Sequence, residues 1–127
     1  MQFVALLWAF PVTLIGLAFA VLIGTSGGIL DRRAIAWETH GGCAARILWL
    51  MNPWMHIDAI AFGHVIIARD AATASRLRAH EHVHLRQFSR WGVLFPIAYA
   101  IASLAAFQRG GCFYRDNRFE QEAFAAE

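Results

Sequence analysis

The chain has 127 residues, of which 58% are hydrophobic and only 16% charged, and its mean hydropathy is +0.45. Soluble domains average about 45–50% apolar and about 25% charged residues, so we expect part of this single-domain chain to lie in lipid. The net charge of +2 is small and the 11 basic residues are spread along the chain, which argues against a nucleic-acid-binding protein.

An uncharged apolar run opens the chain at residues 3–23. About 20 apolar residues are needed to cross the hydrocarbon core of a bilayer, so the run predicts a transmembrane anchor. A cleaved signal peptide is the alternative, because residues 18–20 offer an A-x-A pattern, although no basic residue precedes the run. Arg32 and Arg33 follow it, and by the positive-inside rule they place the rest of the chain in the cytoplasm. We therefore expect a single-pass membrane protein.

Short elements are predicted between this run and residue 70. Residues 34–39 are compatible with a short strand, and residues 43–51 predict a brief apolar helix that ends before Pro53. Residues 57–68 are rich in branched and small side chains and predict one strand, or a tight hairpin kinked at Gly63.

Two cysteines, Cys43 and Cys112, each follow a pair of glycines. They can remain unpaired thiols, or form a disulfide if this part of the chain faces an oxidising compartment. Neither belongs to a C-x-x-C pair, which argues against a cysteine zinc site.

The most specific pattern in the chain is H-E-x-x-H, formed by His80, Glu81 and His84. Residues 71–91 contain no Pro or Gly and carry apolar residues at helical spacing, so they predict a helix. Residues four apart lie one above the other on a helix, so both imidazoles project from one face and can bind one Zn²⁺. Glu81 lies roughly 100° around the helix, where its carboxylate can take a proton from a water on the metal. We interpret His80 and His84 as metal ligands and Glu81 as the catalytic base.

Three other interpretations of the motif compete with this one. The pattern arises in about one shuffled chain in a hundred, and a histidine-rich surface helix would account for it without chemistry. A strand would put His80, His82 and His84 on one face, but the neighbouring Arg, Ala, Leu and Gln residues favour a helix, on which His82 has a supporting or surface position. Haem ligation is disfavoured, because arginines crowd the motif and haem would leave Glu81 without a role.

A zinc site needs at least three protein ligands, and the best partner lies beyond a second apolar stretch at residues 93–107. Residues 114–123 predict a final helix, on which Glu120 has two interpretations. It can close a capping box with Asn117, or its carboxylate can be the third metal ligand. Glu122 is the other candidate ligand on the same helix.

The motif followed by a glutamate on a later helix resembles the gluzincin metallopeptidases, including their membrane-bound and minimal forms. In those families the third ligand commonly stands three residues before a small residue, as in E-x-x-A-D. Glu120 and Ala123 match this pattern, so the resemblance favours Glu120 over Glu122, although Phe124 replaces the acidic residue.

The resemblance extends over about residues 70–127. Gln87, three residues after His84, matches an H-E-x-x-H-x-x-Q variant of the motif. In these families a strand ahead of the zinc helix often binds an extended peptide, and residues 57–68 occupy that position.

If one ion joins the motif to Glu120, residues 93–107 cannot span a membrane and must fold back. We therefore predict a mainly α (α+β) fold in which residues 1–30 form a membrane anchor, or a signal peptide. Residues 31–127 would form a zincin-like metal-binding domain with about three helices and one or two short strands.

These features favour a membrane-anchored zinc-dependent peptidase, with lipid and a peptide or protein substrate as its partners. Glu81 would act as general base, and the metal with Tyr99, Tyr114 or His64 would stabilise the oxyanion. The alternative is a non-catalytic metal-binding membrane protein with a structural or partner-binding role, because 127 residues leave little chain for a substrate cleft.

Overall fold

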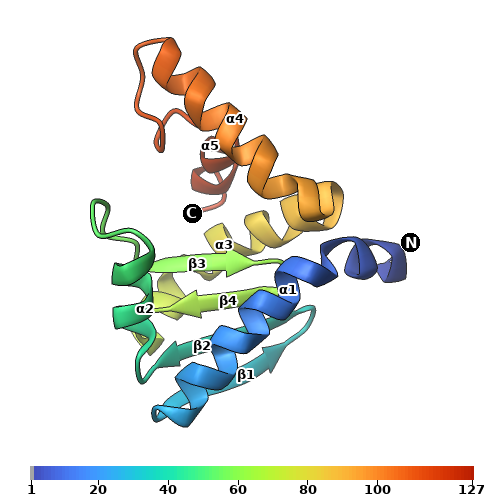
Figure 1. The fold of residues 1–127 in the computed structure, drawn as a ribbon, viewed down its shortest axis with the longest axis vertical. Coiled ribbons are helices and arrows are strands. Elements are labelled where there is room, and N and C mark those ends of the chain that lie inside the picture. Colours follow the sequence, from blue (N-terminus) through green and yellow to red (C-terminus); the bar gives the residue numbers. More distant parts are fainter. Residues whose placement is uncertain (1) are drawn as a thin grey trace.

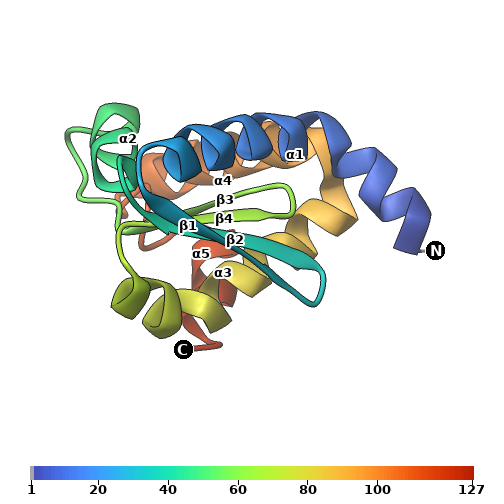
Figure 2. The ribbon, with the colours of Figure 1, turned by 90° about the horizontal axis from the view of Figure 1, so that it is seen from below.

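A four-stranded sheet lies between two helical layers in the computed structural model, which describes residues 2–127 (Figure 1). The elements follow in the order α1 (Gln2–Thr25), β1 (Gly28–Arg33), β2 (Ala36–Gly41), α2 (Ala44–Met51), β3 (Ala59–Phe62), β4 (Val65–Ala68), α3 (Ala71–Trp91), a 3₁₀ turn (Gly92–Leu94), α4 (Phe95–Gln108) and α5 (Arg118–Phe124). Helix α1 covers one face of the sheet and α3 the other, as Figure 2 shows.

The sheet consists of two hairpins joined side by side, with strand order β1-β2-β4-β3. The pairs β1–β2 and β3–β4 are antiparallel, whereas β2 and β4 are parallel, with Trp37 opposite Val65. Strand β3 is therefore an edge strand, and the backbone groups on its outer side have no partner strand in the sheet.

The helix predicted at residues 71–91 is present with those bounds. The side chain of Asp70 accepts a hydrogen bond from the Thr73 amide and caps its start. Gly92, with a φ of +57°, follows its last residue. Of the two interpretations of residues 57–68, the hairpin is present, and Gly63 has a φ of +60° in its turn.

The prediction of one or two strands is wrong, because the sheet has four. The unpredicted strand, β1, is exposed along almost its whole length and contains Asp31, Arg32 and Arg33. It therefore lacks the alternation of apolar and polar residues that marks a half-buried strand. Both cysteines are free thiols, so the possible disulfide is not formed.

Helix α1 contributes to both hydrophobic clusters of the molecule. Ala9 belongs to the cluster that contains Phe88, Phe95 and Phe119, and Ile23 belongs to the cluster around α2. Helix α1 and the rest of the described chain therefore share a core.

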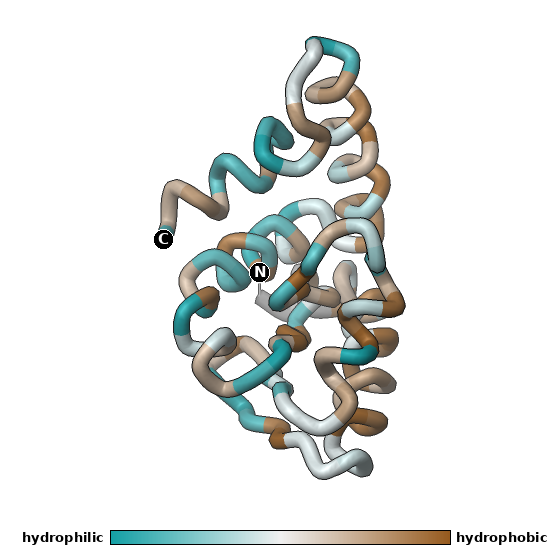
Figure 3. Tube along the Cα trace, turned by 90° about the vertical axis from the view of Figure 1, so that its left-hand side faces the viewer, coloured by the Kyte–Doolittle hydropathy of each residue, from teal (hydrophilic) through white to brown (hydrophobic). Residues whose placement is uncertain are grey.

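By length and composition, two segments could cross a membrane: Leu7–Thr25, and the continuous stretch Ala71–Gln108 that contains α3 and α4. Core helices and signal sequences meet the same criterion. Helix α3 carries the buried His80, Glu81 and His84. The apolar residues of α1 and α4 instead gather along one side of the molecule, on the right in Figure 3.

Candidate metal site

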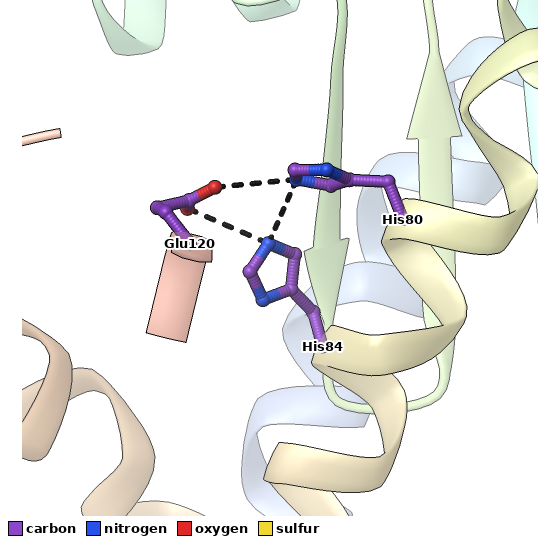
Figure 4. A group of neighbouring side chains, drawn as sticks. All are labelled: His80, His84 and Glu120. Carbon is purple, nitrogen blue, oxygen red and sulfur yellow. Dashed lines mark hydrogen bonds and ion pairs between the residues drawn. The ribbon is translucent and has the colours of Figure 1, made fainter. Parts of the chain in front are cut away.

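Two histidines of α3 and one glutamate of α5 converge in the interior (Figure 4). The Nε2 atoms of His80 and His84 lie 3.2 Å apart. Glu120 places Oε2 3.2 Å from Nε2 of His80 and Oε1 3.4 Å from Nε2 of His84. All three residues are buried, and this His-His-Glu group could hold a metal ion.

Hydrogen bonds on the far side of each imidazole determine which nitrogen carries the proton. Nδ1 of His80 lies 2.8 Å from Oε1 of Glu127, and Nδ1 of His84 lies 2.8 Å from Oε1 of Gln87. A carboxylate only accepts hydrogen bonds, and the Gln87 amide nitrogen is already used as a donor to Phe119. Each Nδ1 is therefore the donor, and each neutral ring has its lone pair on Nε2.

With both rings neutral, the centre of the group contains more lone pairs than donors: among the described residues only the Tyr99 hydroxyl donates into it, to Oε1 of Glu120. Two Nε2 lone pairs face the Glu120 carboxylate, and Oε2 of Glu120 is buried without a hydrogen-bond partner. Buried polar atoms normally find partners, so an orphaned carboxylate oxygen between two imidazole nitrogens requires an explanation. A cation bound between them satisfies all of these atoms at once, so the residues present fit a metal ion.

Helix α5 is fixed in position by contacts at its start. Asn117 caps it by accepting a hydrogen bond from the Phe119 amide, and its own amide donates to Ser103 and to the Tyr99 carbonyl of α4. The backbone amide of Asn117 donates to the Tyr114 carbonyl. The Glu120 side chain faces the histidines, so the alternative interpretation of Glu120 as part of a capping box is wrong.

Glu81 lines the same cavity as the two histidines. It is 4% exposed, and its Oε2 is buried without a hydrogen-bond partner. Burial raises the pKa of Glu81 to about 7, because an ionised carboxylate is poorly solvated in the interior. A carboxyl group with a pKa near neutrality can both take up and release a proton at physiological pH.

A cavity of about 570 Å³ opens onto these residues. His80, Glu81, His84 and Glu120 line it together with residues of the edge strand β3 and aromatic residues of α4 and the C-terminal segment. Its wall is mainly apolar and includes Ile60, Phe62, Phe88, Phe95, Phe113 and Phe124. The chain therefore does build a cleft next to the histidines, despite its length.

The three residues considered as oxyanion donors lie in different places. The hydroxyl of Tyr99 donates to Oε1 of Glu120 at 2.6 Å, and Tyr114 lines the cavity. His64 does not line the cavity; its ring nitrogens contact Thr13 and Ser89, where α1 meets α3.

Glu122 and His82 lie outside the group. Glu122 accepts a hydrogen bond from Gln87 and is exposed. His82 lines a second hollow beside Arg78 and Arg86.

The contacts of Glu127 and Gln87 with the imidazoles were not predicted. The contact between Glu127 and His80 joins positions 47 residues apart, and the sequence contains no pattern that signals it. Gln87 lies three residues after His84, which places both on one side of α3, and that spacing is the signal that could have indicated its contact.

Comparison with models of protein families, with curated proteins and with solved structures finds no match to this chain.

Proposed function

We propose that this chain is a membrane-associated zinc-dependent peptidase. The observation that carries the proposal is the buried group of His80, His84 and Glu120, with the unpartnered Oε2 of Glu81 beside it in an open cavity. The sequence resemblance to gluzincins, in which H-E-x-x-H is followed by a glutamate on a later helix, supports the same conclusion.

The donor set favours zinc. Two imidazole nitrogens and one carboxylate are the protein ligands found in several hydrolytic zinc sites, which leave a further position open. Such an ion acts as a Lewis acid and lowers the pKa of a bound water to about 7. His80, His84 and Glu120 would hold it, while Glu127 and Gln87 fix the orientation of the two rings.

Glu81 is the proposed general base and later proton donor. Glu81 lines the cavity, and its Oε2 has no hydrogen-bond partner among the described residues that would have to be displaced before it accepts a proton from the attacking water. After the peptide bond breaks, the same group would return the proton to the leaving amine. Tyr99 and Tyr114 line the cavity and are the candidates for stabilising the oxyanion. Tyr99 would first have to release its hydrogen bond to Glu120.

The edge strand β3 supports a peptide as the substrate. It lines the cavity along its whole length, and its outer backbone groups face no other strand. An extended peptide could add to this edge by main-chain hydrogen bonds. The apolar wall of the cavity favours a peptide with bulky apolar side chains near the bond to be cleaved.

Membrane association is proposed from the apolar helix α1, which is long enough to cross a bilayer. If α1 crossed the bilayer, the arginines that follow it would favour the cytoplasm for the catalytic part. The packing of α1 on the sheet instead favours a helix that lies in the plane of the membrane.

Replacing Glu81 by glutamine tests the proposal directly. The variant keeps the shape of the side chain and the three metal ligands but cannot accept the proton. We expect zinc content equal to that of the unmodified chain and a 10²–10⁴-fold loss of peptide hydrolysis, measured with a mixture of apolar peptides analysed by mass spectrometry. Glu122→Gln is the matched control, because Glu122 is an exposed glutamate outside the metal group.

Two results would contradict the peptidase. One is zinc-loaded protein that cleaves no peptide in the mixture, and the other is equal cleavage by Glu81→Gln and the unmodified chain. The first result, with zinc bound by the three residues, would instead favour a non-catalytic protein that uses the metal for stability or for binding a partner.

A further inference from the structure

One side of the molecule is formed by three helices that contain almost no charge. Helices α1, α2 and α4 all lie on the upper side of the molecule in Figure 2, whereas α3 and α5 lie on the lower side. The sequences of α1 and α4 contain no charged residue, and α2 contains only Arg46. All nine Asp and Glu residues of the chain lie outside these three helices.

Helix α1 has one side against the sheet and one side exposed. Its buried positions, Ala9, Thr13, Ala20 and Ile23, follow helical spacing and define a single inner stripe. Gly16 lies on the same stripe, where an added Cβ would be 2.7 Å from Cβ of Val65. The side turned away from the sheet exposes large apolar side chains, of which Leu7, Phe10, Leu14, Val21 and Leu22 are 48–72% exposed.

The other two helices extend this apolar surface. On α4, Phe95 and Ala106 are buried, while Ile97, Ile101, Leu104 and Phe107 are 57–65% exposed. Helix α2 exposes Trp49 and Leu50, and Trp54 in the following turn is 92% exposed. These exposed residues of α1, α2 and α4 together with Trp54 form what we call the apolar face.

We propose that the apolar face rests on a lipid bilayer, with α1 lying in the plane of the interface and not across the membrane. If α1 crossed the bilayer in its present position, it would carry the sheet with it, including Asp31, Arg32 and Arg33 of β1. Charged side chains in the hydrocarbon region are costly. If α1 crossed alone, it would leave the sheet and expose the core residues that it covers. In-plane docking buries the apolar face and leaves the fold intact.

The residues at the apolar face favour lipid over a protein partner. Tryptophans such as Trp49 and Trp54 are enriched where a membrane meets water. Arg46 lies on the exposed side of α2, one turn before Trp49, and Arg109 follows the last residue of α4. With no carboxylate in the three helices, these arginines can bind anionic headgroups while their aliphatic parts stay on the apolar surface.

The first test measures binding of the full chain to vesicles of phosphatidylcholine and phosphatidylglycerol by flotation. We expect the unmodified chain to float with the vesicles, and the double variant Ile101→Glu/Leu104→Glu to lose at least about tenfold in its bound fraction, because each charge would enter the lipid. Gln121→Glu, on the exposed surface of α5, is the control and should bind as the unmodified chain does. Equal zinc content in all three proteins would show that they are folded.

The second test separates docking from crossing. Single cysteines replace Val4 and Thr25, near the two ends of α1, in a chain whose native cysteines are serine. We expect an impermeant maleimide to label both from the same side of sealed membrane vesicles prepared from expressing cells. Labelling of the two positions from opposite sides would overturn the proposal in favour of a spanning helix. A full chain that forms dimers and does not float would overturn it in favour of self-association.

Discussion

Gln87 connects the two elements that carry the metal ligands. Its carbonyl accepts the Nδ1 proton of His84, and its amide donates to the Phe119 carbonyl and to Glu122 on α5. A single side chain, 2% exposed, therefore orients one ligand and holds the helix that supplies another.

Replacing Gln87 by leucine removes these contacts while keeping a buried side chain of similar size. We expect zinc affinity to fall about 10–100-fold, because the His84 ring is no longer held and its proton is free to move to Nε2. Competition with a chromophoric chelator measures this. Gln121→Leu makes the same change on the exposed side of α5 and should leave the affinity unchanged. Equal affinities for the two variants would contradict this role for Gln87.

At the scale of residues, the sequence predicts those contacts that follow directly from helical spacing. His80 and His84 are four apart on an uninterrupted helix, which brings their rings together in the structure. The preference for Glu120 over Glu122 came from the resemblance to gluzincins, and Glu120 is the one that faces the histidines. The contact of Glu127 with His80 depends on how the last helix is placed, and no local pattern encodes it.

Among the secondary-structure elements, the contact of α1 with the sheet was not anticipated. An uninterrupted apolar run indicates burial in some apolar environment, but it does not distinguish lipid from a protein core. The small residues on the inner stripe of α1, including Ala9, Gly16 and Ala20, allow the helix to approach the sheet closely. The exposed strand β1 was missed for the opposite reason, because its stability depends on pairing with β2 and not on its own pattern.

Gly16→Ala tests the packing of α1 on the sheet. The new Cβ would be 2.7 Å from Cβ of Val65 and 2.9 Å from Cβ of Phe62, so we expect a loss of about 1–3 kcal/mol in the free energy of unfolding. Gly24→Ala, also in α1, has no atom within 4 Å of the new Cβ. It should be neutral or stabilise the protein by up to about 1 kcal/mol, through helix propensity. If the two variants have the same stability, α1 does not pack on the sheet as described.

A second contact between elements joins β2 to α3. Arg78 donates two hydrogen bonds of 2.9 Å to the buried carboxylate of Glu38. These bonds lower the pKa of Glu38, against the effect of burial. The pair therefore stabilises the fold fully at pH values above the ordinary glutamate pKa of 4.5, and this contribution is lost as the pH falls through the lowered folded-state pKa.

We expect Arg78→Met to reduce the free energy of unfolding by about 1–3 kcal/mol at pH 7, since it leaves a buried carboxylate without its main partner. The difference from the unmodified chain should shrink below the ordinary glutamate pKa, because protonation of Glu38 removes the ion pair in the unmodified chain and the unpaired buried charge in the variant. Denaturant unfolding at a series of pH values measures the difference in the free energy of unfolding. Arg86→Met, on the exposed surface of the same helix, should show no such pH dependence. If the free energy of unfolding of Arg78→Met differs from that of the unmodified chain by the same amount at every pH, the stabilisation does not come from the ion pair.

On the scale of the whole molecule, α4 joins the candidate site to the apolar face. Phe95 and Tyr99 line the cavity from one side of this helix, while Ile97, Ile101 and Leu104 are exposed on the other. The proposed peptidase would therefore work close to the lipid surface, on peptides that reach it there. Sequence analysis could predict neither the cavity nor the apolar face, because each is assembled from elements far apart in the chain.

The proposed peptidase requires one cation held between α3 and α5 by His80, His84 and Glu120. The most direct test is zinc affinity, measured by chelator competition on the full chain and on two variants, Glu120→Gln and Glu122→Gln. We expect one zinc ion per chain, unchanged affinity in Glu122→Gln, and a loss of at least about 100-fold in Glu120→Gln, because a neutral amide is a poor zinc ligand. A chain that binds no zinc, or equal affinity in Glu120→Gln and the unmodified protein, would contradict it.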